Sequence, residues 1–514
     1  MSTVPYEEPE YTKEEWEAIR GRPLFELRDG RQVLDIPASE KLYQLLEEKP
    51  EAPHKEDTGY EWNDAGMAEL FAKLYDHEAR YCPEHKVWYT YHSGAWREDV
   101  GALLVGEKLK EFMRLMILYC GEILDDNRRK DYTAFVNRMG DRRMRERILK
   151  DAAGKMIINA VQFDSNPDLI NCLNGTYDLS TFTFRPARWE DFITMQTNFE
   201  HSDNIFLRCP RWEQFIDEVT EGDKVKAKYL QRALGYSLLG KSNEECMFIL
   251  HGKTTRNGKS TMLNTIEYML GDYSTVSPVG LICKGDRKKD EDAATPSIIR
   301  LKGKRFVTMA ESNEYGQLDE ERIKQLTGGE AITGRALYQA AVTFIPQFTM
   351  WLSCNDLPAV RDKSLFASDR VRVIEFNRHF KPEEQDRDLK EFFMTQESMT
   401  GIFQWLINGY KSYTDYGLVM PEHMTKVVRK YEQDNDLVLQ FLTEKCVTDD
   451  EASIKCSDLY KAYRAWCRGE GMFSCTAFKF KGEMERHPEW FKTISMTHGT
   501  PMYRGLRLKG VQLL

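Results

Sequence analysis

The segment 257–261 reads Asn-Gly-Lys-Ser-Thr and combines the residue types that hold nucleotide phosphates between a strand and a helix. The apolar run 246–250 before it is typical of a buried strand, and apolar residues recur at helical spacing from Ser260 onward. The amides at such a helix start attract anions, Lys259 would neutralise phosphate oxygens, and the Ser260 hydroxyl would bind Mg²⁺. The sequence therefore predicts a phosphate-binding loop formed by Gly252, Asn257, Gly258, Lys259, Ser260 and Thr261.

The spacing of this loop departs from the usual pattern. Five residues separate Gly252 from Gly258, where the common motif has four. The extra residue leaves open how the amides between Lys253 and Arg256 are placed. The predicted roles of Lys259 and Ser260 do not depend on that placement.

Two later strands each deliver a polar residue. Glu311 follows the apolar strand 306–310, and Asn355 follows the strand 348–354. A carboxylate beside a phosphate-binding loop holds Mg²⁺ or activates the attacking water, and an amide can bond to the γ-phosphate. We interpret Glu311 as catalytic, as a metal ligand or as both, and Asn355 as a contact to phosphate or water. The alternatives are an exposed strand end and an Asn that begins a turn.

Positively charged residues surround these strands. Arg370 and Arg372 lie at the strand 371–376, where a guanidinium could enter a neighbouring subunit's site and stabilise transition-state charge. A surface strand with alternating arginines is an equally good explanation. The stretch 324–339 contains three glycines around a short alternating pattern and predicts a hairpin. Its Lys324, Arg335 and Tyr338 are of the types that contact phosphates and stack on bases.

Composition and charge limit the class of protein. The 514 residues are 41% hydrophobic, which excludes global disorder, and no apolar run is long enough to span a membrane. Eleven scattered cysteines favour a reducing cytosol. The short spacings of a zinc site are absent at His77, Cys82, His85 and His92, where neighbouring aromatic residues favour a packed strand pair.

Charge is distributed unevenly along the chain. The net charge is −10, but residues 453–514 carry 11 bases and 5 acids, whereas residues 1–60 carry 15 acids and 8 bases. The basic residues near the end alternate with aromatic ones, which suits DNA binding; a subunit-docking domain with a basic exterior is the alternative.

The pattern of elements predicts an α/β protein with a mostly parallel sheet. The expected segments are an acidic extension, a helicase-associated domain of mixed α and β elements, a nucleotide-binding core, a helical segment and a winged-helix-like DNA-binding domain. In the same order, they cover residues 1–60, 61–204, 205–382, 383–440 and 441–514.

The motifs, taken in order, resemble those of superfamily 3 helicases. The resemblance is closest to the phage and plasmid primase-helicase branch, which is related to poxvirus replicative NTPases. It covers roughly residues 60–514 and rests on 257–261, Glu311, Leu-Thr-Gly-Gly-Glu at 326–330 with Arg335 and Tyr338, Asn-Asp-Leu-Pro at 355–358, Arg370, and the segments 173–179, 235–238 and 460–467.

This resemblance implies an AAA+-like P-loop NTPase core in a hexameric ring, with ATP between subunits and 3′-to-5′ translocation on single-stranded DNA. It assigns ATP and Mg²⁺ to Lys259 and Ser260, hydrolysis to Glu311 and phosphate sensing to Asn355. It also assigns a finger acting on the neighbouring subunit to Arg370. The hairpin after Arg335 would grip DNA.

We therefore expect an ATP-dependent replicative DNA helicase of a phage or mobile element, located in the bacterial cytoplasm. Its expected partners are single-stranded and forked DNA, further copies of itself and possible separate primase or initiator proteins, with no membrane. The alternative is an ATP-controlled initiator or loader that binds DNA without sustained unwinding. A small-molecule kinase fits Asn355, Arg370 and the basic C-terminal part less well.

Overall fold

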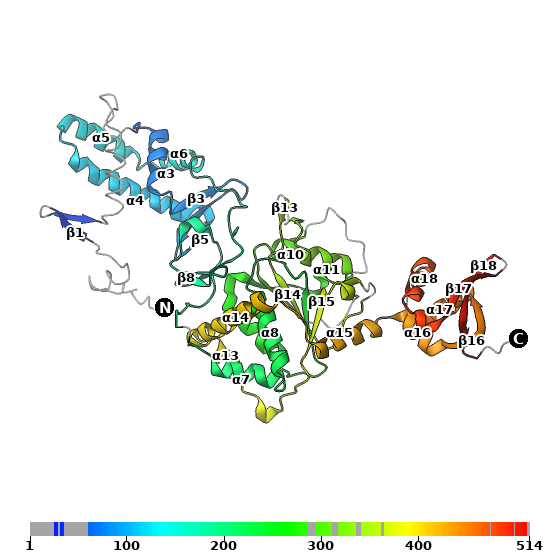
Figure 1. Cartoon of the computed structure of the whole chain (residues 1–514). Coiled ribbons are helices and arrows are strands. Elements are labelled where there is room, and N and C mark those ends of the chain that lie inside the picture. Colours follow the sequence, from blue (N-terminus) through cyan, green and yellow to red (C-terminus); the bar gives the residue numbers. More distant parts are fainter. Residues whose placement is uncertain are drawn as a thin grey trace, which may run out of the picture. The chain divides into compact units, whose positions relative to one another are not determined.

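The computed structural model describes residues 60–204, 206–284, 295–310, 317–335, 341–360, 364–472, 474–497 and 499–510. From residues 1–59 it adds the backbone of β1 (Phe25–Arg28), paired antiparallel with β2 (Arg31–Leu34), so most of the predicted acidic extension lies outside the described residues. Contacts divide the chain into two units between Gln196 and Thr197, whereas the sequence placed a boundary at residue 204. Figure 1 shows the elements of both units.

Besides the pair β1–β2, the N-terminal unit mixes helices with two small antiparallel sheets, of order β3-β4-β5 and β6-β7-β8. The apolar faces of its helices share one core that includes Phe71, Phe112 and Phe135. The predicted packed strand pair is confirmed, because Trp88 and Tyr89 are both buried. The elements are α3 (Asp64–Leu74), β3 (Ala79–Cys82), β4 (Val87–His92), β5 (Ala95–Asp99), α4 (Leu103–Tyr119), α5 (Asp126–Arg138), α6 (Arg142–Ala153), β6 (Leu169–Cys172), β7 (Gly175–Asp178) and β8 (Thr183–Arg185).

The second unit is built on a five-stranded sheet of order β10-β11-β14-β9-β15, in which every neighbouring pair is parallel. The prediction of a mostly parallel α/β sheet is therefore confirmed. Its first elements are α7 (Pro210–Val219), α8 (Lys224–Tyr236), β9 (Met247–His251), α9 (Lys259–Leu270), β10 (Ser274–Val276), α10 (Pro296–Ile299), β11 (Phe306–Ala310), α11 (Glu320–Thr327), β12 (Ile332–Arg335), β13 (Ala341–Phe344), β14 (Thr349–Cys354), α12 (Ser364–Ala367) and β15 (Val371–Glu375).

Further helices follow the sheet: α13 (Leu389–Phe393), α14 (Gln396–Tyr416) and α15 (Glu422–Asp434). Helix α14 packs closely on α8, because each helix presents a glycine where they meet. A Cβ on Gly235 would lie 2.3 Å from the backbone N of Tyr410, and one on Gly409 would lie 2.1 Å from the carbonyl O of Gln231. The segment 235–238 therefore has a structural function. Its Ser237 also joins it to β14, because Ser237 accepts a hydrogen bond from Trp351 Nε1 at 3.0 Å.

The C-terminal part has its own apolar core, with Tyr463, Phe480 and Tyr503 buried together. One strand separates its first two helices, and a β-hairpin ends it. The elements are α16 (Leu437–Lys445), β16 (Cys446–Lys455), α17 (Cys456–Gly469), α18 (Ala477–Glu485), β17 (Thr493–Thr497) and β18 (Thr500–Leu508).

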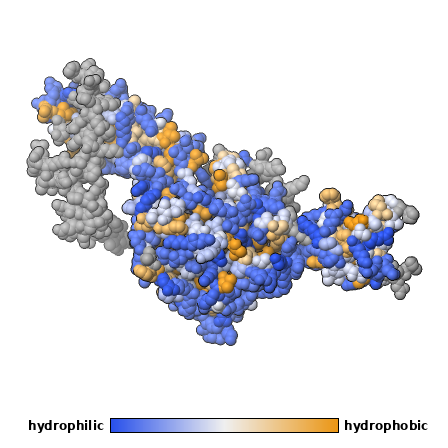
Figure 2. All heavy atoms as spheres, viewed as in Figure 1, coloured by the Kyte–Doolittle hydropathy of each residue, from blue (hydrophilic) through white to orange (hydrophobic). Residues whose placement is uncertain are grey.

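In the view of Figure 2, hydrophilic residues cover most of the visible surface and apolar residues form small areas between them. Across the described ranges, no helix has both the length and the apolar character needed to cross a membrane.

Candidate nucleotide and nucleic-acid site

The loop between β9 and α9 contains two positions that only glycine fits. Gly258 begins α9 with φ +86°, and a Cβ there would lie 2.5 Å from Val219 Cγ1. A Cβ on Gly252 would lie 2.4 Å from the carbonyl O of Phe376. Both contacts are shorter than real Cβ contacts, so the predicted glycines allow neighbouring segments to approach the loop.

The start of α9 suits an anion. Gly258 occupies the N-cap position and supplies no side-chain acceptor, which leaves the first amides of the helix without a side-chain cap. These amides and the positive end of the helix dipole attract phosphate oxygens. Ser260 is exposed on the first turn, where its hydroxyl can reach a metal ion bound to phosphate, and Thr261 is half-buried beside it.

Lys259 and Asn355 meet at the carboxyl ends of the parallel strands. The Lys259 ammonium donates to the carbonyl oxygens of Gly252 at 3.0 Å and Cys354 at 2.9 Å, and to Asn355 Oδ1 at 3.2 Å. The contact arises because β9 and β14 are parallel neighbours, with Cys354 paired to His251, so that their carboxyl ends coincide. The two predicted residues are thus brought together, and Lys259 is only 4% exposed.

The unusually long loop is held by the segment after β15. The backbone N of Phe380 donates to the carbonyl O of Arg256 at 3.0 Å, and His379 Nδ1 donates to the carbonyl O of Thr255 at 2.8 Å. Arg256 accommodates the extra residue with a left-handed φ of +57°. Asn257 is buried and donates to the carbonyl O of Thr254 at 2.6 Å. Sequence reasoning missed His379 and Phe380, which belong to no recognised motif.

His251 is a third residue that sequence reasoning missed. It ends β9, is 8% exposed, and its Nδ1 atom has no hydrogen-bond partner. Burial lowers the pKa of His251, so the ring is neutral at pH 7. His251 directly precedes Gly252 in the sequence, but the phosphate-binding motif begins at Gly252 and assigns no role to the residue before it.

Two predicted residues, Glu311 and Tyr338, lie outside the described residues. The strand that precedes Glu311 is described: β11 is parallel to β14, with Ala310 paired to Ser353. The carboxyl end of β11 therefore lies on the same side of the sheet as Lys259 and Asn355. The roles of Glu311 and Tyr338 remain predictions.

Arg370 lies at the amino ends of the parallel strands, on the opposite side of the sheet from the phosphate-binding loop. Val371 pairs with Met247 and Glu375 with His251, so Arg370 precedes the sheet whereas the loop follows it, roughly 15–20 Å away along the strands. Arg370 Nη1 donates to Thr327 Oγ1 at 2.7 Å, and the guanidinium also pairs with Glu245. Arg370 cannot reach the loop of its own chain. Arg372 is 7% exposed and forms an ion pair with Glu244 at 3.0 Å, which identifies it as structural.

The predicted hairpin is confirmed as the antiparallel pair β12–β13. Arg335 ends β12 with an exposed side chain, and its backbone N donates to Thr295 Oγ1 at 3.1 Å. Lys324 lies half-buried on α11, one turn before Thr327. The structure places Lys324 and Arg335 on different elements.

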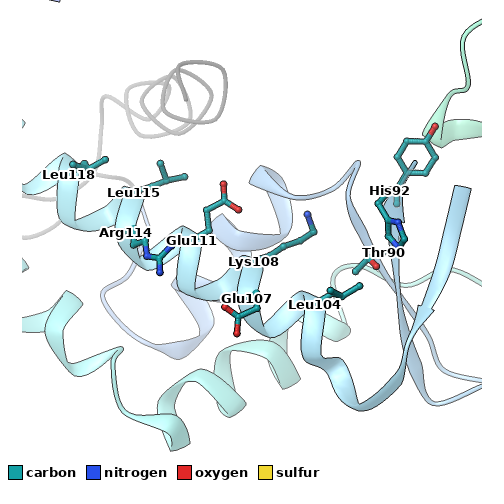
Figure 3. Close-up of a pocket in the computed structure, with 10 residues that line it drawn as sticks. Thr90, His92, Leu104, Glu107, Lys108, Glu111, Arg114, Leu115 and Leu118 are labelled. Carbon is teal, nitrogen blue, oxygen red and sulfur yellow. The ribbon is translucent and has the colours of Figure 1, made fainter. Parts of the chain in front are cut away.

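The N-terminal unit contains a separate cavity of about 630 Å³, lined by residues of α4 and β4 (Figure 3). Its charged residues include Glu107, Lys108 and Arg114, among apolar residues such as Leu104 and Leu118. Lys108 also forms an ion pair with Glu78. None of the predicted site residues lines this cavity.

Three family profiles match successive parts of the chain. Residues 68–221 match the family described as D5 N terminal like, and residues 433–494 match the family Poxvirus D5 protein-like. Residues 250–370, which include the phosphate-binding loop, Asn355 and Arg370, match a family of unknown function, DUF5906.

Individual proteins also match. "Putative helicase L207/L206" of Acanthamoeba polyphaga mimivirus is 24% identical over 452 residues, covering 80% of this chain and 46% of that protein. "Primase D5" of Fowlpox virus is 22% identical over 277 residues, covering 52% of this chain and 33% of that protein. The chain thus spans about half or less of the length of these curated relatives. The NrS-1 C terminal region is a solved structure with TM-score 0.47 and 10% identity, covering 86% of this chain and 99% of that one.

Proposed function

We propose that this chain, which belongs to the D5-related superfamily 3 primase-helicases, is an ATP-dependent replicative DNA helicase of a virus or other mobile element. The matched viral proteins named as helicase and primase support a viral replicative role. A phage or plasmid origin remains a prediction. In our proposal the core is AAA+-like, and its subunits form a ring of six around single-stranded DNA.

One observation carries this proposal. Lys259 and Asn355 converge at the carboxyl ends of the parallel strands, where the loop lies. Arg370 lies at the amino ends of the strands of the same sheet. A motor whose sites form between subunits needs this separation, because one face of each subunit supplies the phosphate contacts and the other face supplies the arginine. A P-loop kinase that works as a monomer has no use for it.

The residues of the loop fit ATP and Mg²⁺. Bound ATP–Mg²⁺ would supply the phosphoanhydride whose hydrolysis drives movement. The amides of α9 and the Lys259 ammonium would hold the phosphates, and the Ser260 hydroxyl would hold the metal ion. Asn355, which contacts Lys259, would report on the γ-phosphate. Glu311 would activate water or hold the metal ion.

DNA would contact the hairpin β12–β13 and the C-terminal domain. Arg335, with Lys324 and Tyr338, would grip the backbone and bases of a single strand. The C-terminal order of helix, strand, two helices and hairpin fits a winged-helix-like domain, in which α18 would face DNA. On α18, Phe478 is 91% exposed and Lys481 is exposed beside it.

Strand separation distinguishes the helicase from the initiator or loader. We expect the wild-type chain to unwind a forked DNA duplex in the presence of ATP and Mg²⁺, and Lys259→Ala to unwind none. A gel assay of labelled strand release measures this directly. ATP hydrolysis that DNA stimulates, without released strand, would contradict the helicase proposal and favour the loader.

Lys481→Ala is expected to weaken DNA binding in a salt-dependent manner. The plot of log affinity against log salt has a negative slope, and loss of one phosphate contact reduces its magnitude by about 0.7–0.9. Fluorescence anisotropy with labelled DNA at several salt concentrations measures the slope. Phe478→Ala is the matched variant on α18: it removes no charge, so it should weaken binding and keep the slope. An unchanged slope in Lys481→Ala would exclude Lys481 as a phosphate contact.

A further inference from the structure

The N-terminal unit carries a strongly basic surface on α5 and α6, to which the proposed function assigns no role. Between residues 138 and 150 the chain has six bases and two acids, although its overall net charge is −10. Such a local excess of positive charge on an acidic chain favours an anionic partner. The bases are Arg138, Arg142, Arg143, Arg145, Arg147 and Lys150.

The bases of α6 lie towards solvent because the apolar residues of this helix face the core. Ile148 and Ala152 are buried. Arg143, Arg147 and Lys150 follow one another at spacings of four and three residues, which places them in one exposed row. At a rise of 1.5 Å per residue this row is about 10 Å long. A row of cations with this length can follow the phosphates along a nucleic-acid strand.

Arg143 and Lys150 are cations whose charge the unit itself does not balance. No acidic side chain among the described residues forms an ion pair with either of them. Glu146, the acid on the same face of α6, is held instead by Arg142 at 2.8 Å. Like charges on one face of a helix repel each other, so Arg143 and Lys150 do not stabilise the helix and can both receive an anion.

The basic surface extends to α4. The charges of Arg114 and Arg145 both help to lower the pKa of Glu107, an effect in which Lys110 has the largest part, so these side chains lie near one another. Glu107 and Arg114 are seven residues apart in the sequence and point to the same side of α4 (Figure 3). Helices α4 and α6 pack on one core. One side of this unit therefore presents arginines from two helices.

The side chains of α6 identify the anion as the phosphate backbone of a nucleic acid. Arginine presents its donors in a planar fork that binds phosphate oxygens in pairs, and four of the five bases of α6 are arginines. The helix has no aromatic residue on which a base could stack. We propose that α6, with Arg143 and Lys150 at its centre, is a further DNA-binding surface that holds backbone phosphates without reading sequence. The inference rests on the proposed function, from which it takes DNA as the partner.

Binding of the full chain to a labelled forked DNA at several salt concentrations tests this surface. Arg143→Gln combined with Lys150→Gln removes two charges, and Arg147 stays unchanged because it also holds Asp64 at 2.6 Å. Loss of two phosphate contacts should reduce the magnitude of the slope of log affinity against log salt by about 1.4–1.8 and weaken binding at physiological salt by at least about tenfold. Arg143→Lys keeps the charge and should keep the slope.

Lys86→Gln combined with Arg188→Gln is the matched control. Both residues are exposed on the N-terminal unit and lie outside α4, α5 and α6, so this variant removes the same charge from another part of the unit. We expect its slope to equal that of the wild type. An unchanged slope in the α6 double variant, or an equal reduction in the control, would overturn the surface. Thermal melting of each variant shows whether the fold is intact.

The same measurements separate this inference from the proposed function. A wild-type chain that unwinds forked DNA, together with an α6 double variant that binds DNA as tightly and with the same slope, removes the α6 surface and leaves the helicase proposal standing. A wild-type chain that binds no DNA overturns both. A reduced slope in the double variant, with the control unchanged, supports the surface whether or not the chain separates strands.

Discussion

Lys259→Ala is expected to lower ATP hydrolysis by at least about 100-fold, the cost of removing one donor that stabilises developing charge. The ammonium is buried and joins three acceptors, Gly252 O, Cys354 O and Asn355 Oδ1. Alanine removes the positive charge beside the phosphates and also the link between the two strand ends. Release of inorganic phosphate, measured with and without single-stranded DNA, gives the rate.

Lys253→Ala is the matched control for this prediction. Lys253 belongs to the same loop and has the same charge, but its side chain is exposed and it lies in the segment whose position the motif does not fix. We expect this variant to keep most of the activity. A Lys259→Ala protein that melts like the wild type and keeps more than about a tenth of its activity would contradict the assignment of Lys259.

The strands and the loop could be predicted from the sequence because their signals are local. The apolar runs before Gly252 and Asn355 mark strands, and helical spacing after Ser260 marks α9. What joins them is not local. The contact between Lys259 and Asn355 depends on β9 and β14 being neighbours, although about 100 residues separate them.

The residues that the sequence did not reveal act through long-range contacts. His379 and Phe380 hold the loop through a ring nitrogen and a backbone amide, and a backbone amide carries no residue-specific signal. Gly258 carried a motif signal, but its contact with Val219 on α7 became visible only in the fold. The strand pattern treated Arg370 and Arg372 alike, and only the fold shows that Arg372 is buried in an ion pair.

Arg370→Ala is expected to lower ATP hydrolysis by about 1,000-fold or more, as loss of an arginine finger does. The alternative is that Arg370 only ties α11 to the sheet through Thr327 and Glu245. Glu245→Ala separates these two explanations, because it breaks the ion pair and keeps the guanidinium. We expect Glu245→Ala to retain hydrolysis; a loss equal to that of Arg370→Ala would identify the residue as structural.

Mixing two inactive variants tests whether the arginine acts between subunits. Lys259→Ala keeps Arg370, and Arg370→Ala keeps the loop, so in an equal mixture about a quarter of the heterologous interfaces in a ring would combine both intact parts. Hydrolysis should therefore rise well above that of either variant alone after the subunits exchange. Residues at opposite ends of the strands are too far apart to form one site within a chain. Recovery of hydrolysis therefore requires a site shared by two copies. A mixture no more active than its components, in which mixed rings are demonstrated by mass, would overturn the shared site.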